Sequence, residues 1–269
     1  MTSKQKSIFI TGAASGIGKA TAIHFAKKGW NIGLFDINEK GLDDVAREIG
    51  HNSCMIGKLD VTSQSDWEHA SKSFAEYTGG KCDLFFSNAG IANFTGRLQD
   101  IPIQESQKII DVNFSGVVKG MYAMLPLLKN TERSVIVSTS SIGGFLPVPG
   151  ASVYSATKFA VRGLTEALRI EFKEYGIDVC EVNPWFTETP ILDAKSTSNK
   201  MDGILNRDVI QKRGRIHPVS KVAETVFSIY GHRKIHNKIG WEGKLTAFLM
   251  NYCPVIIRIF SRKMYKDYF

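Results

Sequence analysis

A tyrosine and a lysine lie four residues apart in the stretch YSATK, which runs from Tyr154 to Lys158. On an α-helix this spacing is about one turn, so both side chains face the same side and can reach one target. An ammonium group beside a phenol stabilises the phenolate and lowers the pKa of the phenol. The pair therefore has the chemistry of a general acid/base that works near neutral pH. For an isolated pair of this kind, a solvated helix face is the alternative interpretation.

A glycine-rich turn, TGAASGIG, follows a short apolar segment and precedes an amphipathic one. Glycines allow the backbone to approach a phosphate closely, and the first amides of the following helix favour an anion. The spacing is GxxxGxG, which differs from the GxGxxG of the usual dinucleotide fingerprint. The residues of this turn that we expect to contact a nucleotide are Gly12, Ser15, Gly16, Ile17 and Gly18.

Asp36 ends the next expected strand and follows Gly18 at close to the spacing of about 20 residues expected of a ribose-binding acid. Its carboxylate can accept hydrogen bonds from an adenosine ribose and repels a 2′-phosphate. Neither Ile37 nor Ser15 brings a basic side chain to receive such a phosphate. Asp36 therefore favours NAD over NADP, with a simple strand-end turn residue as the alternative.

Short apolar segments alternate with longer amphipathic segments along most of the chain. The expected strands cover residues 7–11, 31–36, 54–60, 84–87, 134–138 and 178–182, and the expected helices cover 17–28, 39–49, 66–77, 106–128 and 154–175. This alternation predicts βαβ units and an α/β fold with a doubly wound parallel sheet. Ligands of such sheets bind beyond the carboxyl ends of the strands, where the motifs fall.

Composition limits the classes of function. The 269 residues, 43% of them hydrophobic, suit one large domain with a sizeable core. The net charge of +8 suits an anionic cofactor or an acidic surface, but no helix-turn-helix or zinc-finger pattern favours nucleic acid. The four cysteines form no CxxC pair and the six histidines lack metal-ligand spacing, so we expect no metal site. Without an apolar leader, a reduced, cytoplasmic protein is expected.

Together these motifs resemble the short-chain dehydrogenase/reductase family in its single-domain form, from Ser7 to about Tyr230. Besides the glycine turn and YSATK, the resemblance rests on NFSG from Asn113 and on STSSIGG. It also rests on two short motifs that the family uses at the nucleotide, DV and NAG, which here are Asp60, Val61, Asn88, Ala89 and Gly90. The resemblance implies a Rossmann-like sheet of about seven strands flanked by helices.

The resemblance also implies roles for four residues. Tyr154 would exchange a proton with the reacting oxygen, and Lys158 would bind the nicotinamide ribose and lower the pKa of the tyrosine. Ser141 would hydrogen-bond the reacting oxygen, and Asn113 would hold a water in a proton relay. The two other serines of STSSIGG compete with Ser141, which is favoured by its distance in sequence from Tyr154.

The segment NPWFTET stands where the family usually has Pro-Gly followed by a threonine. Pro184, Thr187 and Thr189 fit that pattern, and Thr187 and Thr189 would contact the nicotinamide carboxamide. Trp185 replaces the usual glycine, which puts the local backbone geometry in doubt. The indole would narrow the substrate pocket, stack near the nicotinamide or pack under a covering segment.

Family members take their substrate under a mobile segment, here about residues 190–215. The candidate pocket residues are Phe94, Ile142, Phe145, Leu146, Trp185 and Phe186. If they line the pocket, the pocket is apolar and suits a lipophilic alcohol or carbonyl compound, such as a hydroxysteroid, a retinol-like compound or a long-chain acyl compound.

The C-terminal residues extend beyond the family's minimal core, so we expect a catalytic domain over residues 1–240 and an extension over 241–269. Residues 245–257 are uncharged, Pro254 interrupts them, and the basic stretch RIFSRKMYKDYF follows. The apolar run is shorter than the roughly 20 residues of a spanning helix. Two interpretations stay open: a peripheral contact with a membrane surface, or a cover for the substrate pocket or a subunit contact.

The sequence thus predicts an NAD-dependent oxidoreductase that interconverts a lipophilic alcohol and its carbonyl compound, with lipid metabolism as a natural setting. An NADPH-dependent 3-oxoacyl-carrier-protein reductase is the nearest alternative, which Asp36 disfavours and the basic charge favours. A non-catalytic nucleotide-sensing protein is a further alternative, although such proteins tend to lose the tyrosine or the lysine. The resemblance suggests a homodimer or homotetramer through the two long helices.

Overall fold

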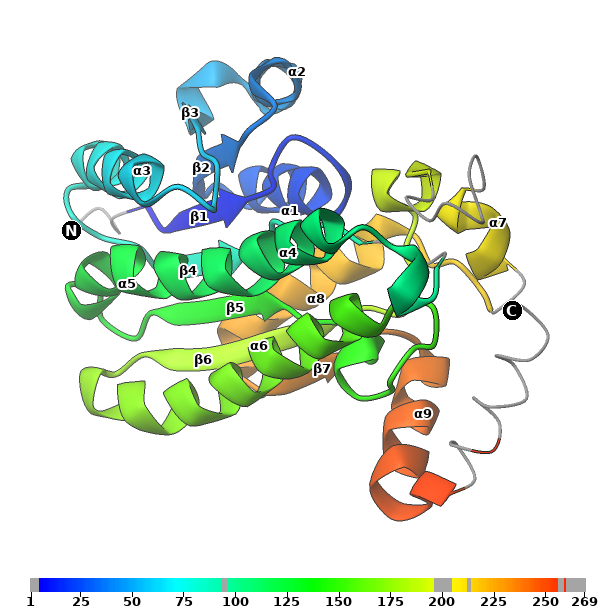
Figure 1. Ribbon diagram of the computed structural model, residues 1–269. Helices are drawn as coiled ribbons and strands as arrows, with labels where there is room; N and C mark the ends of the chain where they lie inside the picture. Colours follow the sequence, from blue (N-terminus) through cyan, green and yellow to red (C-terminus); the bar gives the residue numbers. More distant parts are fainter. Residues whose placement is uncertain (1–4, 93–95, 196–204, 212–213, 256–258, 260–269) are drawn as a thin grey trace.

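Seven parallel strands form one sheet at the centre of the computed structural model, which describes residues 5–92, 96–195, 205–211, 214–255 and 259 (Figure 1). The strand order is β3-β2-β1-β4-β5-β6-β7, and every pair is parallel. The strands are β1 (Ser7–Thr11), β2 (Asn31–Asp36), β3 (Cys54–Lys58), β4 (Leu84–Ser87), β5 (Val135–Thr139), β6 (Asp178–Asn183) and β7 (His236–Lys238). The order reverses between β1 and β4, which places a binding crevice at their carboxyl ends.

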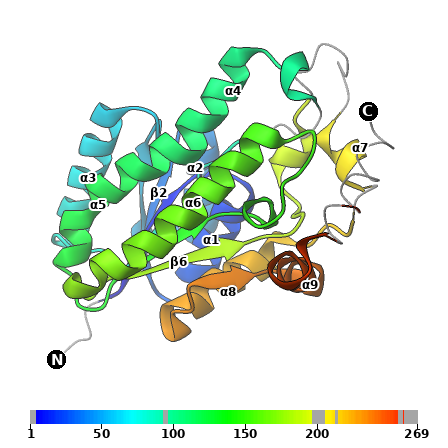
Figure 2. The same cartoon turned by 60° about the horizontal axis from the view of Figure 1, so that its bottom comes forward.

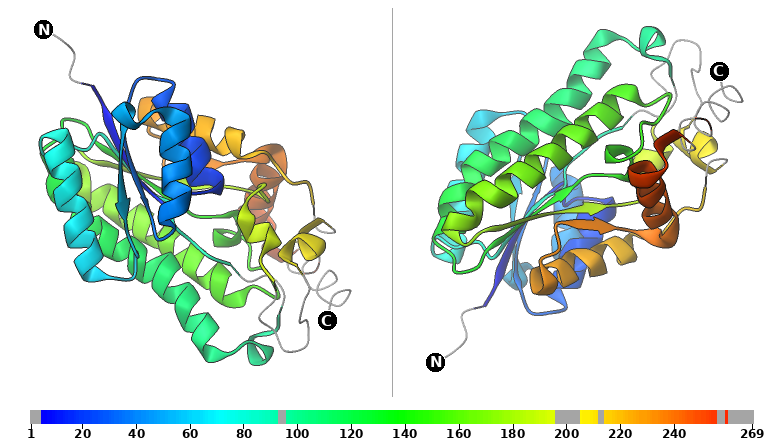
Figure 3. Two further views of the ribbon diagram at one scale, coloured as in Figure 1. Left: turned by 90° about the horizontal axis from the view of Figure 1, so that it is seen from above. Right: turned by 90° about the horizontal axis from the view of Figure 1, so that it is seen from below.

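Helices cover both faces of the sheet (Figures 2 and 3). One face carries α1 (Gly16–Ala26), α2 (Glu39–Ile49) and α8 (Val219–His232). The other face carries α3 (Gln64–Thr78), α5 (Gly116–Lys129) and α6 (Ser152–Glu171). Side-chain caps start two of these helices, because Asn38 accepts a hydrogen bond from Gly41 N and Ser63 accepts one from Asp66 N.

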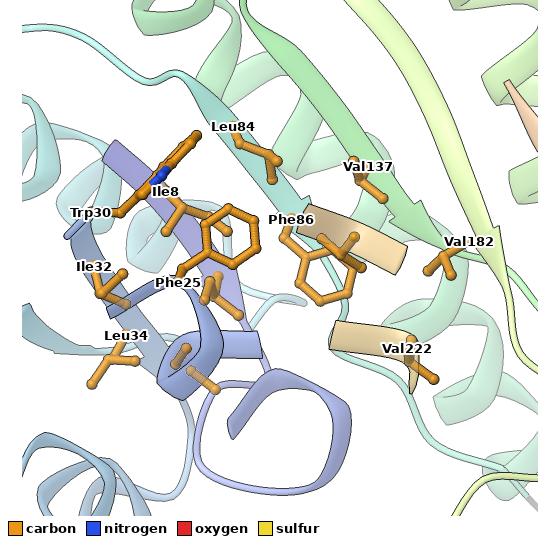
Figure 4. Close-up of a cluster of buried hydrophobic side chains, with 14 of the residues drawn as sticks. Ile8, Phe25, Trp30, Ile32, Leu34, Leu84, Phe86, Val137, Val182 and Val222 are labelled. Atoms are coloured by element: carbon orange, nitrogen blue, oxygen red, sulfur yellow. The ribbon is translucent and has the colours of Figure 1, made fainter. Parts of the chain in front are cut away.

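The hydrophobic core divides into two layers because successive side chains of a strand point to opposite faces. Ile8 and Ile10 of β1 join the cluster under α1 and α8, in which Phe25 and Val222 are also buried (Figure 4). Phe9, between them in sequence, faces the other layer with Trp67 and Phe85. Burial on both faces explains why the central strands β1, β4 and β5 are mostly apolar.

The expected helix over 106–128 is interrupted in the structure. It consists of α4 (Ile103–Ile110), a π-helical turn over Asp111–Ser115, and α5. The π-helical turn carries Asn113, whose side chain bonds the backbone of Ile91. Similarly, the expected helix over 154–175 starts two residues earlier at Ser152 and ends in a 3-10 turn over Phe172–Tyr175.

The C-terminal part of the chain adds a strand at one edge of the sheet and helices at the end of the molecule toward which the strands run. Strand β7 pairs with β6, and α9 (Gly240–Tyr252) follows it directly. The short α7 (Asn206–Gln211) lies at the same end as α9 (Figure 1). In the part of the chain that the structure describes, no helix is both long enough and apolar enough to cross a membrane.

Candidate active site

A cavity of about 890 Å³ opens beyond the carboxyl ends of the strands, and most of the expected site residues line it. From the expected nucleotide site, the lining includes Gly12, Ser15, Gly16, Ile17, Asp36, Asp60, Val61, Asn88, Ala89, Gly90, Pro184, Thr187 and Thr189. From the expected reaction centre and pocket, it includes Ser141, Ile142, Leu146, Tyr154, Lys158, Trp185 and Phe186. Segments distant in sequence thus meet at one site.

The glycine turn needs glycine at two positions for different reasons. Gly12 has φ +67°, in the left-handed region, and a Cβ there would lie 3.0 Å from Ala89 Cα. Gly18 is absent from the cavity lining, and a Cβ on it would lie 2.0 Å from Gly12 O. Gly18 therefore allows α1 to pack against the turn, and Gly12 forms the wall of the cavity.

Asn88 ties three strand ends together at the floor of the cavity. Its Nδ2 donates to Thr11 O (3.0 Å), and its Oδ1 accepts a hydrogen bond from Thr139 Oγ1 (3.0 Å). The Thr11 hydroxyl in turn accepts from the amides of Asn88 and Ala89. Thr11 and Thr139 were not predicted as site residues, although a hydroxyl at a strand end was the available signal.

Asp36 lies at the carboxyl end of β2 with both carboxylate oxygens engaged by backbone amides. Ala14 N donates to Oδ2 (3.1 Å), and Asn38 N donates to Oδ1 (2.9 Å). The carboxylate is thereby oriented between the glycine turn and the start of α2, and Asp36 remains part of the cavity wall. A carboxylate oxygen has more than one lone pair, so each can still accept a ribose hydroxyl.

Tyr154 and Ser141 form the hydroxyl pair of the site. Ser141 begins the 3-10 turn Ile142–Gly144, and its Oγ accepts a hydrogen bond from Gly143 N (3.0 Å). Burial raises the pKa of Tyr154, and a hydrogen bond with Ser141 partly opposes that rise. The net direction is opposite to the lowered pKa expected from the sequence, because burial disfavours the phenolate more strongly than its neighbours favour it.

Lys158 lies one helical turn beyond Tyr154, as the spacing predicted. Its ammonium nitrogen is 5.6 Å from the centroid of the Tyr154 ring and donates to Thr139 O at 2.8 Å. The residue is only 4% exposed. Burial lowers the pKa of Lys158 to about 8, and the negative charge of the buried Glu181 carboxylate partly opposes this. Lys158 is thus a poorly solvated cation beside the phenol.

Replacement of this lysine should stabilise the fold. A pKa of about 8 in place of 10.5 means that the charged form is disfavoured by burial, at a cost on the order of 3 kcal/mol at pH 7. We expect Lys158→Met to raise the melting temperature at pH 7 and to eliminate turnover. The unfolded chain holds the lysine proton up to about pH 10.5, so the advantage of the variant should shrink between pH 8 and 10.5.

The measurement is thermal unfolding of both proteins across this pH range, with Lys72→Met on an exposed position of α3 as the control. The control should melt close to the wild type at every pH. A Lys158→Met protein that is less stable at pH 7, or whose stability difference from the wild type does not vary with pH, contradicts the burial cost.

Asn113 is fully buried, and it is not one of the described residues that line the cavity. Its Oδ1 accepts from Ile91 N (2.9 Å), and its Nδ2 donates to Ile91 O (2.8 Å). A weaker contact of Nδ2 reaches Thr157 Oγ1 at 3.4 Å. The amide therefore holds the loop after β4 against α6 from the π-helical turn.

Phe145 was wrongly expected to line the substrate pocket. Its ring is buried outside the cavity lining, with the Arg162 guanidinium 3.9 Å and the Lys238 ammonium 4.8 Å from its centroid. His236 contacts it edge-on. The 3-10 turn before it directs Phe145 toward α6 and β7, whereas Ile142 and Leu146 face the cavity. Phe94 lies outside the described residues.

Trp185 lies both in the cavity wall and in a packed cluster. Its side chain lines the cavity and packs with Ile142 and Ala247, the latter from α9. Among the described residues the non-glycine positions with positive φ are Arg133 and Arg233, so Trp185 does not need the conformation of the glycine that it replaces. Part of the expected covering segment, residues 196–204 and 212–213, lies outside the described residues.

The C-terminal extension contributes directly to the cavity wall. Leu245, Thr246 and Leu249 of α9 line the cavity from the side of Trp185. Of the two interpretations of this segment, α9 as a pocket cover thus agrees with the structure. Within the described residues, no group of histidine, cysteine, aspartate and glutamate is arranged to hold a metal ion.

Comparison with known proteins identifies the same family over most of the chain. A family model described as short chain dehydrogenase matches residues 6–200. An uncharacterized oxidoreductase of Listeria monocytogenes is 36% identical over 208 residues, which are 76% of this chain and 83% of that protein. A cyclohexanol dehydrogenase of Acinetobacter sp. is 33% identical over 189 residues, 70% of this chain and 75% of that protein.

A solved structure shares the fold at a similar level of identity. The 3-ketoacyl-(acyl-carrier-protein) reductase from Brucella melitensis, solved in complex with NADH, superimposes with a TM-score of 0.76. The two chains are 29% identical, and the match covers 88% of this chain and 98% of that one.

Proposed function

The chain belongs to the short-chain dehydrogenase/reductase family and is an oxidoreductase with a nicotinamide cofactor, and we propose that it uses NAD to interconvert a lipophilic alcohol and its carbonyl compound. The observation that supports this most directly is the grouping of Ser141, Tyr154 and Lys158 in the wall of one cavity. The nicotinamide supplies the hydride chemistry when it is bound.

The proton chemistry is assigned to Tyr154. With its pKa raised by burial, the phenol carries its proton near neutral pH and can donate it to a carbonyl oxygen. In the opposite direction it takes the proton of the alcohol. Ser141, already hydrogen-bonded to Tyr154, orients the reacting oxygen. Lys158 holds a positive charge beside the phenol and offers donors to ribose hydroxyls, and Asn113 keeps the loop after β4 in place against α6.

The preference for NAD over NADP rests on Asp36. The cations that line the described part of the cavity, Lys108 and Lys158, come from α4 and α6, whereas Asp36 ends β2 in the other half of the sheet. Lys58, its partner on β3, is paired with Glu39 at 3.1 Å. A 2′-phosphate bound next to Asp36 would therefore be repelled by the carboxylate, and none of these three lysines is available to neutralise it.

The lipophilic substrate is inferred from the part of the cavity around Tyr154. Tyr154 packs against a cluster that contains Leu192 and Ile210, and Phe186 and Val148 contact the same cluster. Trp185 and Leu249 add apolar surface from the side of α9. Because the cyclohexanol dehydrogenase of Acinetobacter carries a cyclic secondary alcohol in its name, cyclohexanol is a sensible first substrate.

The test is a series of secondary alcohols of increasing apolar size with NAD. We expect kcat/KM to rise with size, by up to about tenfold for every two CH₂ groups that the cavity buries. Turnover limited to small polar alcohols would contradict the lipophilic assignment and leave the oxidoreductase intact.

Reduction of a 3-oxoacyl group on a carrier protein is the second candidate. The Brucella reductase supports it by similarity, and the net charge of +8 suits an acidic carrier. A higher kcat/KM for a 3-oxoacyl carrier protein with NADPH than for any free alcohol with NAD would favour this candidate.

We further propose that two copies associate through α5 and α6. These helices present Tyr122 and Ile170 to solvent, 77% and 78% exposed, together with Phe159. Apolar side chains this exposed on two adjacent long helices are typical of a subunit contact. Sedimentation velocity should find a dimer or tetramer, which Tyr122→Glu combined with Ile170→Glu should dissociate; a monomeric wild type would contradict the contact.

A further inference from the structure

Helix α9 carries a second exposed apolar surface, distinct from that of α5 and α6. Trp241, Leu245, Phe248 and Tyr252 follow one another at intervals of three and four residues, so they lie along one side of the helix. They are 68%, 47%, 56% and 71% exposed. The rings of Phe248 and Tyr252 contact each other with centroids 4.7 Å apart. We call these four residues the α9 stripe.

Contacts with the body of the protein fix the orientation of α9, and with it the direction in which the α9 stripe faces. Gly243 and Ala247 on another side of the helix are buried. Near the start of α9, Glu242 Oε2 lies 3.2 Å from Nε2 of the buried His217. The stripe lies on the other side of the helix from these buried residues and therefore faces solvent. Helix α9 itself lies at the outside of the molecule (Figures 1 and 2).

The α9 stripe is continuous with the cavity. Leu245 belongs to both, and Thr246 and Leu249 of the same helix line the cavity. Whatever covers the stripe thus lies next to the apolar part of the cavity. A second copy of the chain seated there would lie against the part of the cavity wall that α9 forms, whereas a lipid surface could deliver a lipophilic substrate at that point.

The charge around the stripe favours a lipid surface that is anionic. From Trp241 to the end, the sequence has five cations and two acids. One acid is Glu242, which is engaged with His217, and Lys244 is exposed on α9 itself. The other four cations, Arg258, Arg262, Lys263 and Lys266, follow in the sequence and lie outside the described residues. Aromatic residues beside lysines and arginines match the chemistry of a membrane interface.

We propose that the α9 stripe docks on an anionic lipid surface and places the opening of the cavity against it. This inference rests on the proposed lipophilic substrate for its purpose, but docking itself is independent of catalysis. Trp241, Phe248 and Tyr252 enter the interfacial layer, and Lys244 contacts the headgroups. The substrate then enters between α9 and the loop of Trp185 and Phe186.

The experiment is co-sedimentation of the full chain with phosphatidylcholine vesicles, with and without phosphatidylglycerol. We expect the wild type to bind the anionic vesicles and to dissociate at high salt. Trp241→Glu combined with Phe248→Glu should weaken this binding at least about tenfold, because each residue loses its buried apolar area. The matched control is Tyr122→Glu combined with Ile170→Glu, which should retain vesicle binding even if it dissociates the subunits.

A second readout separates docking from catalysis. Neither Trp241 nor Phe248 lines the cavity, so the Trp241→Glu/Phe248→Glu protein should oxidise cyclohexanol in solution at the wild-type rate. On a long-chain alcohol presented in vesicles it should lose turnover along with binding. If no alcohol is turned over while binding still depends on the stripe, docking stands and the proposed function fails.

Two results would overturn the inference. The first is vesicle binding that the stripe variant leaves unchanged. The second is a wild-type protein that does not bind vesicles, together with a Trp241→Glu/Phe248→Glu protein whose sedimentation coefficient differs from that of the wild type. The control should not show this difference. That result would assign the α9 stripe to a contact between copies of the chain.

Discussion

Tyr154→Phe is expected to lower kcat by about 10²- to 10⁴-fold, the usual contribution of general acid/base catalysis, while NADH still binds. The hydroxyl is the group assigned to the proton transfer, and its loss removes no described contact of Lys158, which bonds Thr139 O. Ser141 also keeps its hydrogen bond from Gly143 N. The binding site should therefore remain formed. The measurements are kcat with a lipophilic alcohol and the dissociation constant of NADH from fluorescence.

Tyr122→Phe is the matched control, because it removes a phenolic hydroxyl from an exposed position on α5. It should leave both constants unchanged. If the Tyr154→Phe protein keeps its activity within about threefold of the wild type, another group transfers the proton and the assignment of Tyr154 is wrong.

Asp36→Asn is expected to reduce the preference for NADH over NADPH. Hydrogen bonds to a charged group contribute about 1.5–3 kcal/mol, so loss of the carboxylate should weaken NADH binding by roughly 10- to 100-fold. The same change removes the repulsion of a 2′-phosphate, and NADPH binding should tighten. Asparagine is preferred to alanine because it keeps an acceptor for the amides of Ala14 or Asn38.

Titration of both cofactors into the wild type and the variant gives the ratio of dissociation constants. Asp43→Asn serves as the control, since it makes the same change at an exposed position of α2 that does not line the cavity. The control should keep the wild-type ratio. A wild type that binds NADPH as tightly as NADH would show that Asp36 does not select the cofactor.

The main elements of the fold could be predicted from the sequence because its signals are local. The apolar strands are buried on both faces and read as continuous runs, and the spacing of Tyr154 and Lys158 fixes their common side of α6. Strand β7 escaped prediction because its three residues, His236, Asn237 and Lys238, are polar and pair at the sheet edge. The π-helical turn at Asn113 escaped because the apolar pattern continues through it.

The site was less predictable where tertiary contacts determine the direction of a side chain or its pKa. The direction of Phe145 depends on the backbone of a 3-10 turn, which has no sequence period of its own. The pKa of Tyr154 depends on how much burial outweighs its neighbours, and the sequence indicates the neighbours alone. For the C-terminal extension the sequence left a pocket cover and a membrane contact both open, and the contribution of α9 to the cavity wall follows from the position of β7.

The central claim is hydride transfer between NAD and a lipophilic alcohol at the cavity of Tyr154. The most direct test is the formation of NADH from NAD and a lipophilic secondary alcohol by the wild-type protein, with the ketone product quantified in parallel. The account predicts equal amounts of NADH and ketone, and a slower rate when the carbinol hydrogen is deuterium. Tight NADH binding without turnover of any alcohol or carbonyl compound would contradict it.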